Sequence, residues 1–384
     1  MASSVSSQQD KVLVEANSFA RIITLNRPKQ LNALSFQMIS RLLELFLAYE
    51  EDPNVKLIIL KGKGRAFSVG GDVATLVRDM RADDWRVGAN FFSQVFKLIY
   101  LIATYSKPQV SILNGIVMGG GAGISVHGRF RVATENTSFA MPEAALGLFP
   151  DVAASYFLSR FPGFLGEYVG LTGSRLDGAE MLACGLATHF VPSAKLPLLE
   201  AALCDVDSSD PVIISSIIDQ YSKQPSLKEL SVYNRRLDVI DRCFSQRTVE
   251  EIISALERED VHQSDSWISA TIQTLKKSSP TSLKIFLRSI REGRLQGVGQ
   301  CLVREYRMVS HVMQGELSKD FFEGCRATLL DKDKNPNWEP SKLELIDDAR
   351  VDCYFCKVKH EEWEDLKLPN RSQFELPPYA IAKL

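Results

Sequence analysis

The chain has 384 residues, 45% hydrophobic and 24% charged, proportions typical of a globular protein with one large domain or two moderate ones. Its 45 basic and 47 acidic side chains leave a net charge of −2, so no nucleic-acid partner is expected. No apolar run approaches the roughly 18 residues that span a bilayer, and no membrane association is predicted.

The chain begins with two short β-branched runs, at 12–14 and 21–25, which predict a β-hairpin. Residues 1–10 before them are polar, with neither the apolar core of a secretory signal nor the arginines of a mitochondrial leader, and are expected to be disordered. A helix with Ser35 as its N-cap should follow the hairpin. The apolar run at 56–60 then predicts a buried strand.

A glycine-rich loop, 62–72, follows this strand, and the order of strand, glycine loop and helix then recurs. The pattern predicts a helix at 84–104, a strand at 109–113 and a second glycine loop at 114–123. A third cycle starts with a strand at 130–133. This is an α/β pattern that gathers its loops at strand ends, where sites are usually built.

Beyond about residue 205 the strands disappear and amphipathic helices follow, with Pro280 as the first residue of one of them. No low-complexity linker separates this part, so residues 205–350 should pack on a core formed by residues 11–204. Residues 351–384 are polar and proline-rich, and predict a short helix followed by a loosely ordered tail. The helices are expected at 213–221, 249–256, 268–275, 282–291 and 302–312.

Seven cysteines are scattered along the chain, most of them in apolar or helical stretches, as is usual for buried thiols of a reducing compartment. Cys353 and Cys356 form the one close pair, with His360 four residues on. A zinc site would need a fourth ligand, and none is near in sequence. A helix surface explains the pair better, and neither a metal nor a cofactor is predicted.

The two glycine loops admit two explanations. The run from Gly119 to Gly123 does not complete G-x-G-x-x-G because Val126 stands at the last position, and no phosphate-binding G-x-x-x-x-G-K-[ST] is present. One explanation is tight packing of a helix against a strand. The other is an oxyanion hole, in which two loops present backbone N–H groups to one point and glycine lets the substrate approach.

Three segments, 25–34, 66–72 and 114–123, resemble in order and spacing the three motifs of the crotonase superfamily. The resemblance implies a spiral of ββα turns over about residues 11–190, followed by a helical C-terminal region. It also implies that Gly71 and Gly120 supply the oxyanion donors. Acyl-CoA would lie between the loops, with its phosphates and adenine near Arg27, Lys29 and Ala66.

Carboxylates decide the subfamily. A hydratase of this superfamily places one Glu after the glycine run and another in a later Pro-Glu; here the first position is Gly123 and only the second survives, as Glu143. Segments 126–134 and 142–151 look like those of 3-hydroxyisobutyryl-CoA hydrolases, a likeness that extends to about residue 330. It implies a thioester hydrolase of valine breakdown in which Glu143 and Asp151 are catalytic and, with Gly120, contact the substrate.

The residues alone leave several roles open. Glu143 could be a charge at a helix N-terminus, and Asp151 a helix N-cap. As a catalyst, Glu143 could attack the thioester directly or act as a base on water, while Asp151 positions or protonates its partners. Ser125 and His127 do not form G-x-S-x-G and are expected in the core.

One position departs from the hydrolase pattern. Relatives carry a substrate-contacting Glu before an aromatic residue in the helix that precedes strand 109–113, and here Val95 stands at that place. Valine cannot accept a hydrogen bond from a 3-hydroxyl group, and the adjacent Gln94 points elsewhere on a helix. Acyl specificity therefore stays open. So do enoyl-CoA hydration or isomerisation, and a CoA-binding relative without catalysis.

The last three residues, Ala382-Lys383-Leu384, are a close variant of the S-K-L peroxisomal address. Pro377 and Pro378 favour an extended, accessible tail before them. We therefore expect a peroxisomal import receptor as a partner and the peroxisome as the location. A cytosolic or mitochondrial enzyme with a coincidental tail is the alternative.

Overall fold

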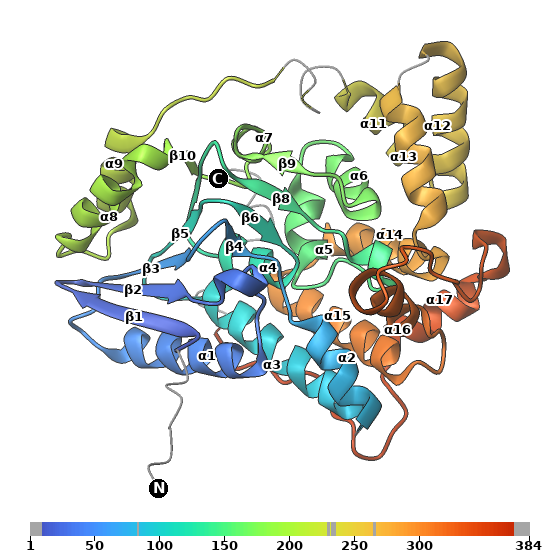
Figure 1. Cartoon of the computed structure of the whole chain (residues 1–384), viewed down its shortest axis with the longest axis horizontal. Helices are drawn as coiled ribbons and strands as arrows, with labels where there is room; N and C mark the ends of the chain where they lie inside the picture. The colour runs from blue at the N-terminus through green and yellow to red at the C-terminus, as the bar shows by residue number, and fades with distance from the viewer. Residues whose placement is uncertain (1–9, 83, 229–230, 232–235, 264–265, 372–384) are drawn as a thin grey trace, which may run out of the picture.

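The computed structural model describes residues 10–82, 84–228, 231, 236–263 and 266–371. The expectations for residues 1–9 and for the tripeptide 382–384 lie outside this part of the chain. A six-stranded sheet and a four-stranded sheet form the centre of the molecule (Figure 1). Two strand pairs, β1 with β2 and β8 with β9, are antiparallel, and the others are parallel.

The larger sheet has the order β1 (Val12–Asn17), β2 (Ala20–Leu25), β3 (Leu57–Gly62), β5 (Gln109–Leu113), β7 (Phe130–Ala133), β10 (His189–Phe190). The smaller has the order β4 (Ala66–Ser68), β6 (Ile116–Met118), β8 (Ser138–Ala140), β9 (Leu176–Asp177). The predicted hairpin and the strands predicted near 56–60, 109–113 and 130–133 are confirmed, as is the α/β fold with a helical C-terminal region.

The helices that alternate with these strands are α1 (Phe36–Glu51), α2 (Val73–Ala82), α3 (Trp85–Ala103), α4 (Gly120–Val126), α5 (Ala154–Phe157), α6 (Leu165–Thr172), α7 (Gly178–Ala183) and α8 (Leu196–Cys204). Short 3₁₀ turns lie between them: η1 (Pro28–Gln30), η2 (Glu143–Leu146), η3 (Leu158–Arg160) and η4 (Ser193–Lys195). Ser35 caps α1 as predicted, because its side chain accepts a hydrogen bond from the Met38 N–H.

Alternating side chains of the large sheet build two cores. In β3, Ile58 and Leu60 face the main core, whereas Leu57 and Ile59 face a smaller one. The smaller core is closed by apolar residues of α8 and α9 (Pro211–Tyr221). Because both faces of this strand are covered, its run is apolar throughout rather than alternating.

After Phe190 the described chain contains helices and turns and no further strand. The helices are α9, α11 (Leu237–Phe244), α12 (Val249–Gln263), α13 (Ser266–Lys277), α14 (Pro280–Gly293), α15 (Val298–Gln314), α16 (Asp320–Cys325) and α17 (Asp348–Phe355), with a π-turn η5 (Arg326–Leu330) and a 3₁₀ turn η6 (Leu343–Leu345). Pro280 is the first residue of α14, as predicted.

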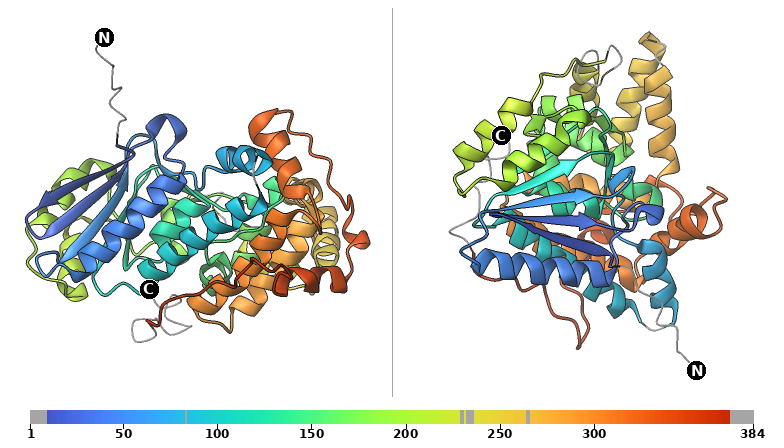
Figure 2. Two further views of the ribbon diagram at one scale, coloured as in Figure 1. Left: turned by 90° about the horizontal axis from the view of Figure 1, so that it is seen from below. Right: turned by 60° about the vertical axis from the view of Figure 1, so that its left-hand side comes forward.

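The last helices pack on the α/β core rather than standing apart. In Figure 2, α14 to α17 lie at the end of the molecule opposite β1 and β2. Helix α15 runs along α3, the long helix whose N-cap is Asp84. The aromatic rings of Phe96 on α3 and Tyr306 on α15 meet edge to face, with centroids 6.5 Å apart.

The segment after α17 differs from the expected loose tail as far as residue 371. The Trp363 ring stacks on Tyr306 with centroids 5.8 Å apart, and its Nε1–H donates to the Ser310 hydroxyl at 3.0 Å. Arg371 donates to the Thr104 carbonyl oxygen at 2.9 Å and to the Glu50 carboxylate at 2.6 Å. One tryptophan and one arginine thus anchor a segment whose overall polarity suggested a free tail.

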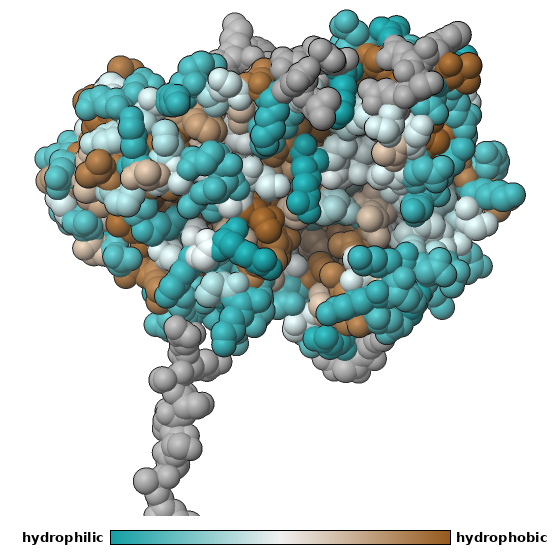
Figure 3. Space-filling view, turned by 45° about the horizontal axis from the view of Figure 1, so that its top comes forward, coloured by the Kyte–Doolittle hydropathy of each residue, from teal (hydrophilic) through white to brown (hydrophobic). Residues whose placement is uncertain are grey.

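Cys353 and Cys356 are exposed at the end of α17, as expected for a helix surface, and the described residues include no cluster of His, Cys, Asp and Glu that could hold a metal. Among the same residues, no helix is both long and apolar enough to cross a bilayer. Figure 3 shows a largely hydrophilic face on which hydrophobic residues gather around a central hollow.

Candidate active site

A small cavity of about 80 Å³ lies where the two glycine loops meet. It brings together five residues that the sequence pointed to: Gly71, Val95, Gly120, Glu143 and Asp151. The lining is otherwise mainly apolar: Leu34, Val69, Gly70, Val73, Phe91, Phe92, Gly119, Pro142, Leu146, Leu148 and Val152.

The two loops are in direct contact through their backbones. A Cβ placed on Gly120 would lie 3.3 Å from the Gly71 nitrogen, and one on Gly70 would lie 3.0 Å from the Gly120 nitrogen. Within the described residues, neither the Gly71 nor the Gly120 N–H donates to a protein acceptor. Two backbone N–H groups without a protein acceptor therefore lie close together at the cavity, and an oxyanion hole requires two such groups.

Backbone pairing with Leu34 fixes the first of these loops. The Leu34 N–H donates to the Gly70 carbonyl oxygen at 2.8 Å, and the Asp72 N–H donates to the Leu34 carbonyl oxygen at 3.0 Å. The second loop turns at Gly119, which has φ +49° and ψ −126°. Only glycine adopts this combination readily, so the turn that starts α4 depends on it.

The Glu143 carboxyl group lies against this second loop. A Cβ on Gly119 would lie 2.8 Å from Glu143 Oε1, so the missing side chain makes room for the carboxyl group. Glu143 is 6% exposed, and its Oε2 has no protein hydrogen-bond partner among the described residues. A buried carboxyl oxygen without a partner is costly to the fold, and in a cavity that is also lined by Gly71 and Gly120 it points to chemistry.

The chain places Glu143 at the start of η2, just after β8. The Ser279 N–H donates to the Ala144 carbonyl oxygen at 3.2 Å, and a Cβ on Gly147 would lie 2.1 Å from the Asp320 carbonyl oxygen. The C-terminal helices therefore pack directly on the turn that carries this carboxyl group.

Asp151 lines the same cavity and is 4% exposed. Its side chain is not a helix N-cap, because α5 begins after Ala153 and has no side-chain cap. The two residues that follow it, Val152 and Ala153, have φ of 57° and 60°. A left-handed pair without glycine is strained, and the strain lies directly beside the cavity.

Burial strongly shifts the two carboxyl groups. It raises the pKa of Glu143 well above its usual value, and the nearby Asp151 carboxyl raises it further. It also raises the pKa of Asp151, with the charge of Glu305 as the next cause. The site thus holds two coupled carboxyl groups that keep protons to higher pH than free ones do, as general acids and bases at such sites often do.

Helix α3 supplies the apolar wall of the cavity. Phe91, Phe92 and Val95 face it, and Val95 is 3% exposed. The position where hydrolases of the resembled group carry a Glu therefore does lie at the cavity, and here it offers only methyl groups.

Gly123 cannot carry the second carboxylate of a hydratase in this structure. A Cβ there would lie 2.7 Å from the Ile99 Cδ1 and 2.7 Å from the Val152 Cβ. Ser125 and His127 lie in the core, as expected: the Ser125 hydroxyl donates to the Gly121 carbonyl oxygen at 2.8 Å, and burial lowers the pKa of His127 to about 4.

The residues expected near CoA lie outside the cavity lining. Arg27 pairs with Asp72 at 3.0 Å and donates to the Ala33 carbonyl oxygen at 2.6 Å, next to the Gly71 turn. Lys29 is exposed on η1. Ala66 is buried in β4, where its carbonyl oxygen accepts from the Asn32 amide.

The sequence did not single out three other features of the site: the wall of Phe91 and Phe92, the strained turn after Asp151, and Glu305 behind that turn. Two adjacent phenylalanines on an apolar helix look like ordinary core residues. The signal that could have revealed Glu305 is its place: an acidic residue on the apolar face of a helix, close to Leu302 and Met308.

The raised pKa of Glu143 predicts how stability depends on pH. The folded state holds the Glu143 proton more tightly than the unfolded chain does. The stability that this proton provides is therefore complete below the pKa of the unfolded chain, about 4.3, and is lost as pH rises through the pKa of the folded state. Glu143→Gln removes that loss, worth about 1.4 kcal/mol per pKa unit. Its melting temperature should therefore exceed that of the wild type by a margin that widens between pH 5 and pH 8.

Glu323→Gln is the matched control of opposite sign, because hydrogen bonds from Arg326 lower the pKa of Glu323. That variant should lose stability relative to the wild type as pH rises. Parallel melting curves of Glu143→Gln and the wild type across the range would contradict the shift.

Known proteins resemble this chain over nearly its whole length. A family model described as enoyl-CoA hydratase/isomerase matches residues 20–355. 3-Hydroxyisobutyryl-CoA hydrolase 1 of Arabidopsis thaliana is 72% identical over 376 residues, which cover 98% of each protein. Probable 3-hydroxyisobutyryl-CoA hydrolase 3 of the same plant is 69% identical over 365 residues, covering 95% of this chain and 96% of that protein.

Among solved structures, a carnitinyl-CoA dehydratase from Mycobacterium thermoresistibile superposes with a TM-score of 0.84 at 33% identity, covering 94% of this chain and 99% of that one. The crotonase resemblance is thereby confirmed for both sequence and fold. The chain belongs to the enoyl-CoA hydratase/isomerase family.

Proposed function

We propose that this protein hydrolyses acyl-CoA thioesters and that 3-hydroxyisobutyryl-CoA, an intermediate of valine breakdown, is its substrate. One observation carries the hydrolysis: the buried Glu143 carboxyl group lies against the loop of Gly119 and Gly120, in a cavity that Gly71 also lines and that lacks the second carboxylate of a hydratase. The names of the two plant relatives support the same reaction and this acyl group.

The two N–H groups are proposed to bind the thioester oxygen as it becomes an oxyanion. Backbone donors held by a rigid turn need no reorganisation when charge develops, and losing one such donor typically costs about 3 kcal/mol in the transition state. The Gly70–Gly120 contact fixes the separation of the loops before substrate arrives.

Glu143 is proposed as the group that starts the reaction, by one of two routes. As a nucleophile, its carboxylate attacks the thioester carbon, the C–S bond breaks, and water then hydrolyses the mixed anhydride. As a base, it takes a proton from water, whose oxygen attacks the same carbon. In both routes the CoA sulfur leaves as a thiolate, and Asp151, whose pKa burial raises, is the proposed proton donor to it.

The acyl group is proposed to lie between α3 and Val152. The cavity holds about 80 Å³, less than an engineered cavity of about 150 Å³ that accepts benzene, and this small volume favours a short or branched acyl chain. The CoA part is proposed to extend past Arg27 and Lys29 toward the backbone at Ala66, and no cofactor besides the substrate's own CoA is proposed.

Activity should depend on both carboxyl groups. With release of the CoA thiol as the readout on a panel of acyl-CoA esters, Glu143→Gln should lose at least a hundredfold in kcat and Asp151→Asn at least tenfold, because the first removes the attacking group and the second the proton donor. Glu167→Gln is the matched control: Glu167 is fully buried and ion-paired with Arg294, away from the cavity.

Near-normal turnover by Glu143→Gln would rule out this mechanism. Loss of an enoyl-CoA absorbance instead of thiol release would indicate hydration, and binding without turnover of any ester would indicate a CoA-binding protein without catalysis.

Discrimination for the 3-hydroxyl group should be weak, and Val95→Glu should raise it. A hydrogen bond from the substrate hydroxyl to a carboxylate is worth about 1.5–3 kcal/mol, so kcat/KM for 3-hydroxyisobutyryl-CoA over isobutyryl-CoA should rise about ten- to a hundredfold. Val95→Leu, which keeps the wall apolar, should leave the ratio unchanged. An unchanged ratio in Val95→Glu would show that position 95 does not face the hydroxyl group.

We also propose that the protein is peroxisomal, with Ala382-Lys383-Leu384 as the segment bound by the import receptor. A fluorescent protein fused to the N-terminus, leaving Leu384 free, should therefore colocalise with a peroxisomal marker in puncta. Removing residues 382–384 should disperse the signal, because the import receptor would then have no segment to bind. Puncta that persist after the deletion would show that another segment directs the protein.

A further inference from the structure

The turn after Asp151 is strained and must be held from outside. Val152 and Ala153 both adopt left-handed backbone conformations, which are strained for a residue with a Cβ. Such a pair persists only where surrounding contacts over-determine it. The turn also fixes where the Asp151 carboxyl group lies, since Asp151 directly precedes it.

Glu305, 152 residues beyond Ala153, supplies those contacts. One carboxylate oxygen, Oε2, accepts from the Ala153 N–H at 2.7 Å. The other, Oε1, accepts from the Ser155 N–H at 3.1 Å and from the Ser155 hydroxyl at 2.5 Å. The Val152 carbonyl is held separately by the His127 ring, at 3.0 Å.

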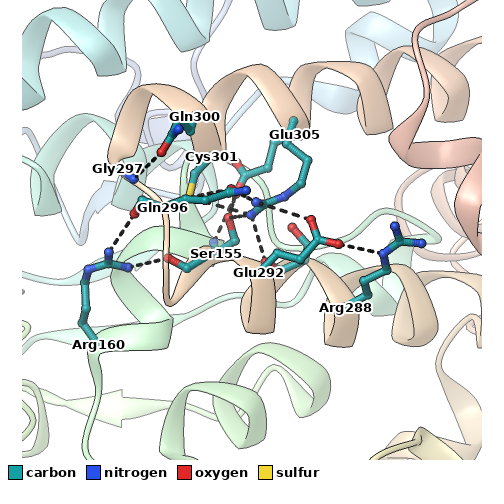
Figure 4. Close-up of polar contacts among 12 residues, drawn as sticks. Ser155, Arg160, Arg288, Glu292, Gln296, Gly297, Gln300, Cys301 and Glu305 are labelled. Atoms are coloured by element: carbon teal, nitrogen blue, oxygen red, sulfur yellow. Dashed lines mark hydrogen bonds and ion pairs between the residues drawn. The ribbon is translucent and has the colours of Figure 1, made fainter. Parts of the chain in front are cut away.

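This carboxylate is buried yet not neutralised by a direct ion pair within the described residues. Glu305 is 0% exposed. Its neighbour Arg304 donates instead to the Ser155 hydroxyl at 2.8 Å and to the Ser289 carbonyl oxygen at 2.9 Å. Figure 4 shows Glu305 and Ser155 meeting between α15 and the α5 segment, with Gln296 and Cys301 beside them.

We propose that Glu305 is a positioning residue for the reaction: it holds the Val152–Ala153 turn and thereby places the Asp151 carboxyl group in the cavity, with a second negative charge behind it. The inference rests on the proposed hydrolysis. Glu305 touches no substrate in this scheme, because it does not line the cavity, and it acts through Asp151.

The electrostatic surroundings agree with this role. Burial raises the pKa of Glu305 to about 7, and hydrogen bonds from Ser155 and the charge of Arg304 oppose the rise. The Glu305 charge in turn raises the pKa of Asp151 and of the Cys301 thiol. Arg304, Asp151 and Cys301 are the titratable groups coupled to it, so a change at residue 305 should be felt at Asp151.

Glu305→Gln is the test, with the thiol-release assay as readout. An amide has one acceptor oxygen where the carboxylate uses two, so one side of the turn loses its hydrogen bond. We expect kcat to fall ten- to a hundredfold and KM to change less than threefold. Without the charge of Glu305, the pKa of Asp151 should fall, so the basic limb of the pH profile of kcat should move to lower pH. The difference from the wild type should be clearest above pH 7, where Glu305 of the wild type is charged.

Glu167→Gln again controls for the loss of a buried carboxylate. This variant should change neither kcat nor the pH at which kcat falls on the basic side of its profile. Ser155→Ala keeps the carboxylate and removes one of its three donors, so it should give a smaller fall in kcat; it also serves if Glu305→Gln does not fold. The proposal would be overturned if kcat of Glu305→Gln fell while the basic limb of its pH profile stayed in place. It would also be overturned if Glu167→Gln showed the same fall and the same shift.

A measurement without turnover separates this inference from the proposed function. The Asp151 carboxyl titration, followed by carbon-13 NMR and assigned with Asp151→Asn, should shift to lower pH in Glu305→Gln. If the wild type hydrolysed no acyl-CoA ester and this shift still occurred, the reaction would be wrong and the role of Glu305 right. An unchanged titration would overturn the role of Glu305 whatever the activity.

Discussion

The site depends on keeping the Glu143 carboxyl group out of water, in the cavity that the Gly71 and Gly120 loops also line. An isolated buried carboxylate is expensive, and Glu143 Oε2 has no protein partner among the described residues to offset the cost. The pKa rises instead, so the group holds its proton to higher pH than a free carboxyl group does. Gly119 makes the arrangement possible, because any side chain there would occupy the position of Glu143 Oε1.

The C-terminal helices are part of this site rather than an appendage. Asp320 packs on Gly147 behind Glu143, and Gly324 packs on Leu146 with a Cβ position 2.4 Å from its carbonyl. Glu305 holds the turn behind Asp151. Glu143 and Asp151 therefore each lie on a turn of the α/β core that is backed by the helical region. Removing that region would leave both turns without support, which gives a physical reason why the family match runs to residue 355.

The sequence revealed those parts of the fold and site that have a local cause. Ser35 before an apolar helix, glycine runs after apolar strands, and a single surviving Pro-Glu are all written within a few residues. The left-handed turn at Val152 and Ala153 is not, because neither residue favours that conformation and the stabilising contact comes from Glu305, far along the chain. The segment between α17 and residue 371 differs from the expectation for a related reason: Trp363 and Arg371 anchor it, although its average polarity suggested solvent.

The apolar wall has a consequence for selectivity. A pocket that hydrogen-bonds a hydroxyl group strongly rejects the analogue without that group, because a buried polar group of the pocket would be left unpaired. An apolar pocket discriminates between the two ligands only about a hundredfold or less. With Val95, Phe91 and Phe92 facing the acyl chain, no buried acceptor on α3 is left unsatisfied by isobutyryl-CoA. A volume of about 80 Å³ then favours short acyl chains, while the apolar side chains of α3 do not distinguish a hydroxyl from a hydrogen. Among the described side chains that line the cavity, only Glu143 and Asp151 are polar, so a side chain that recognised the hydroxyl group would also be one proposed for catalysis.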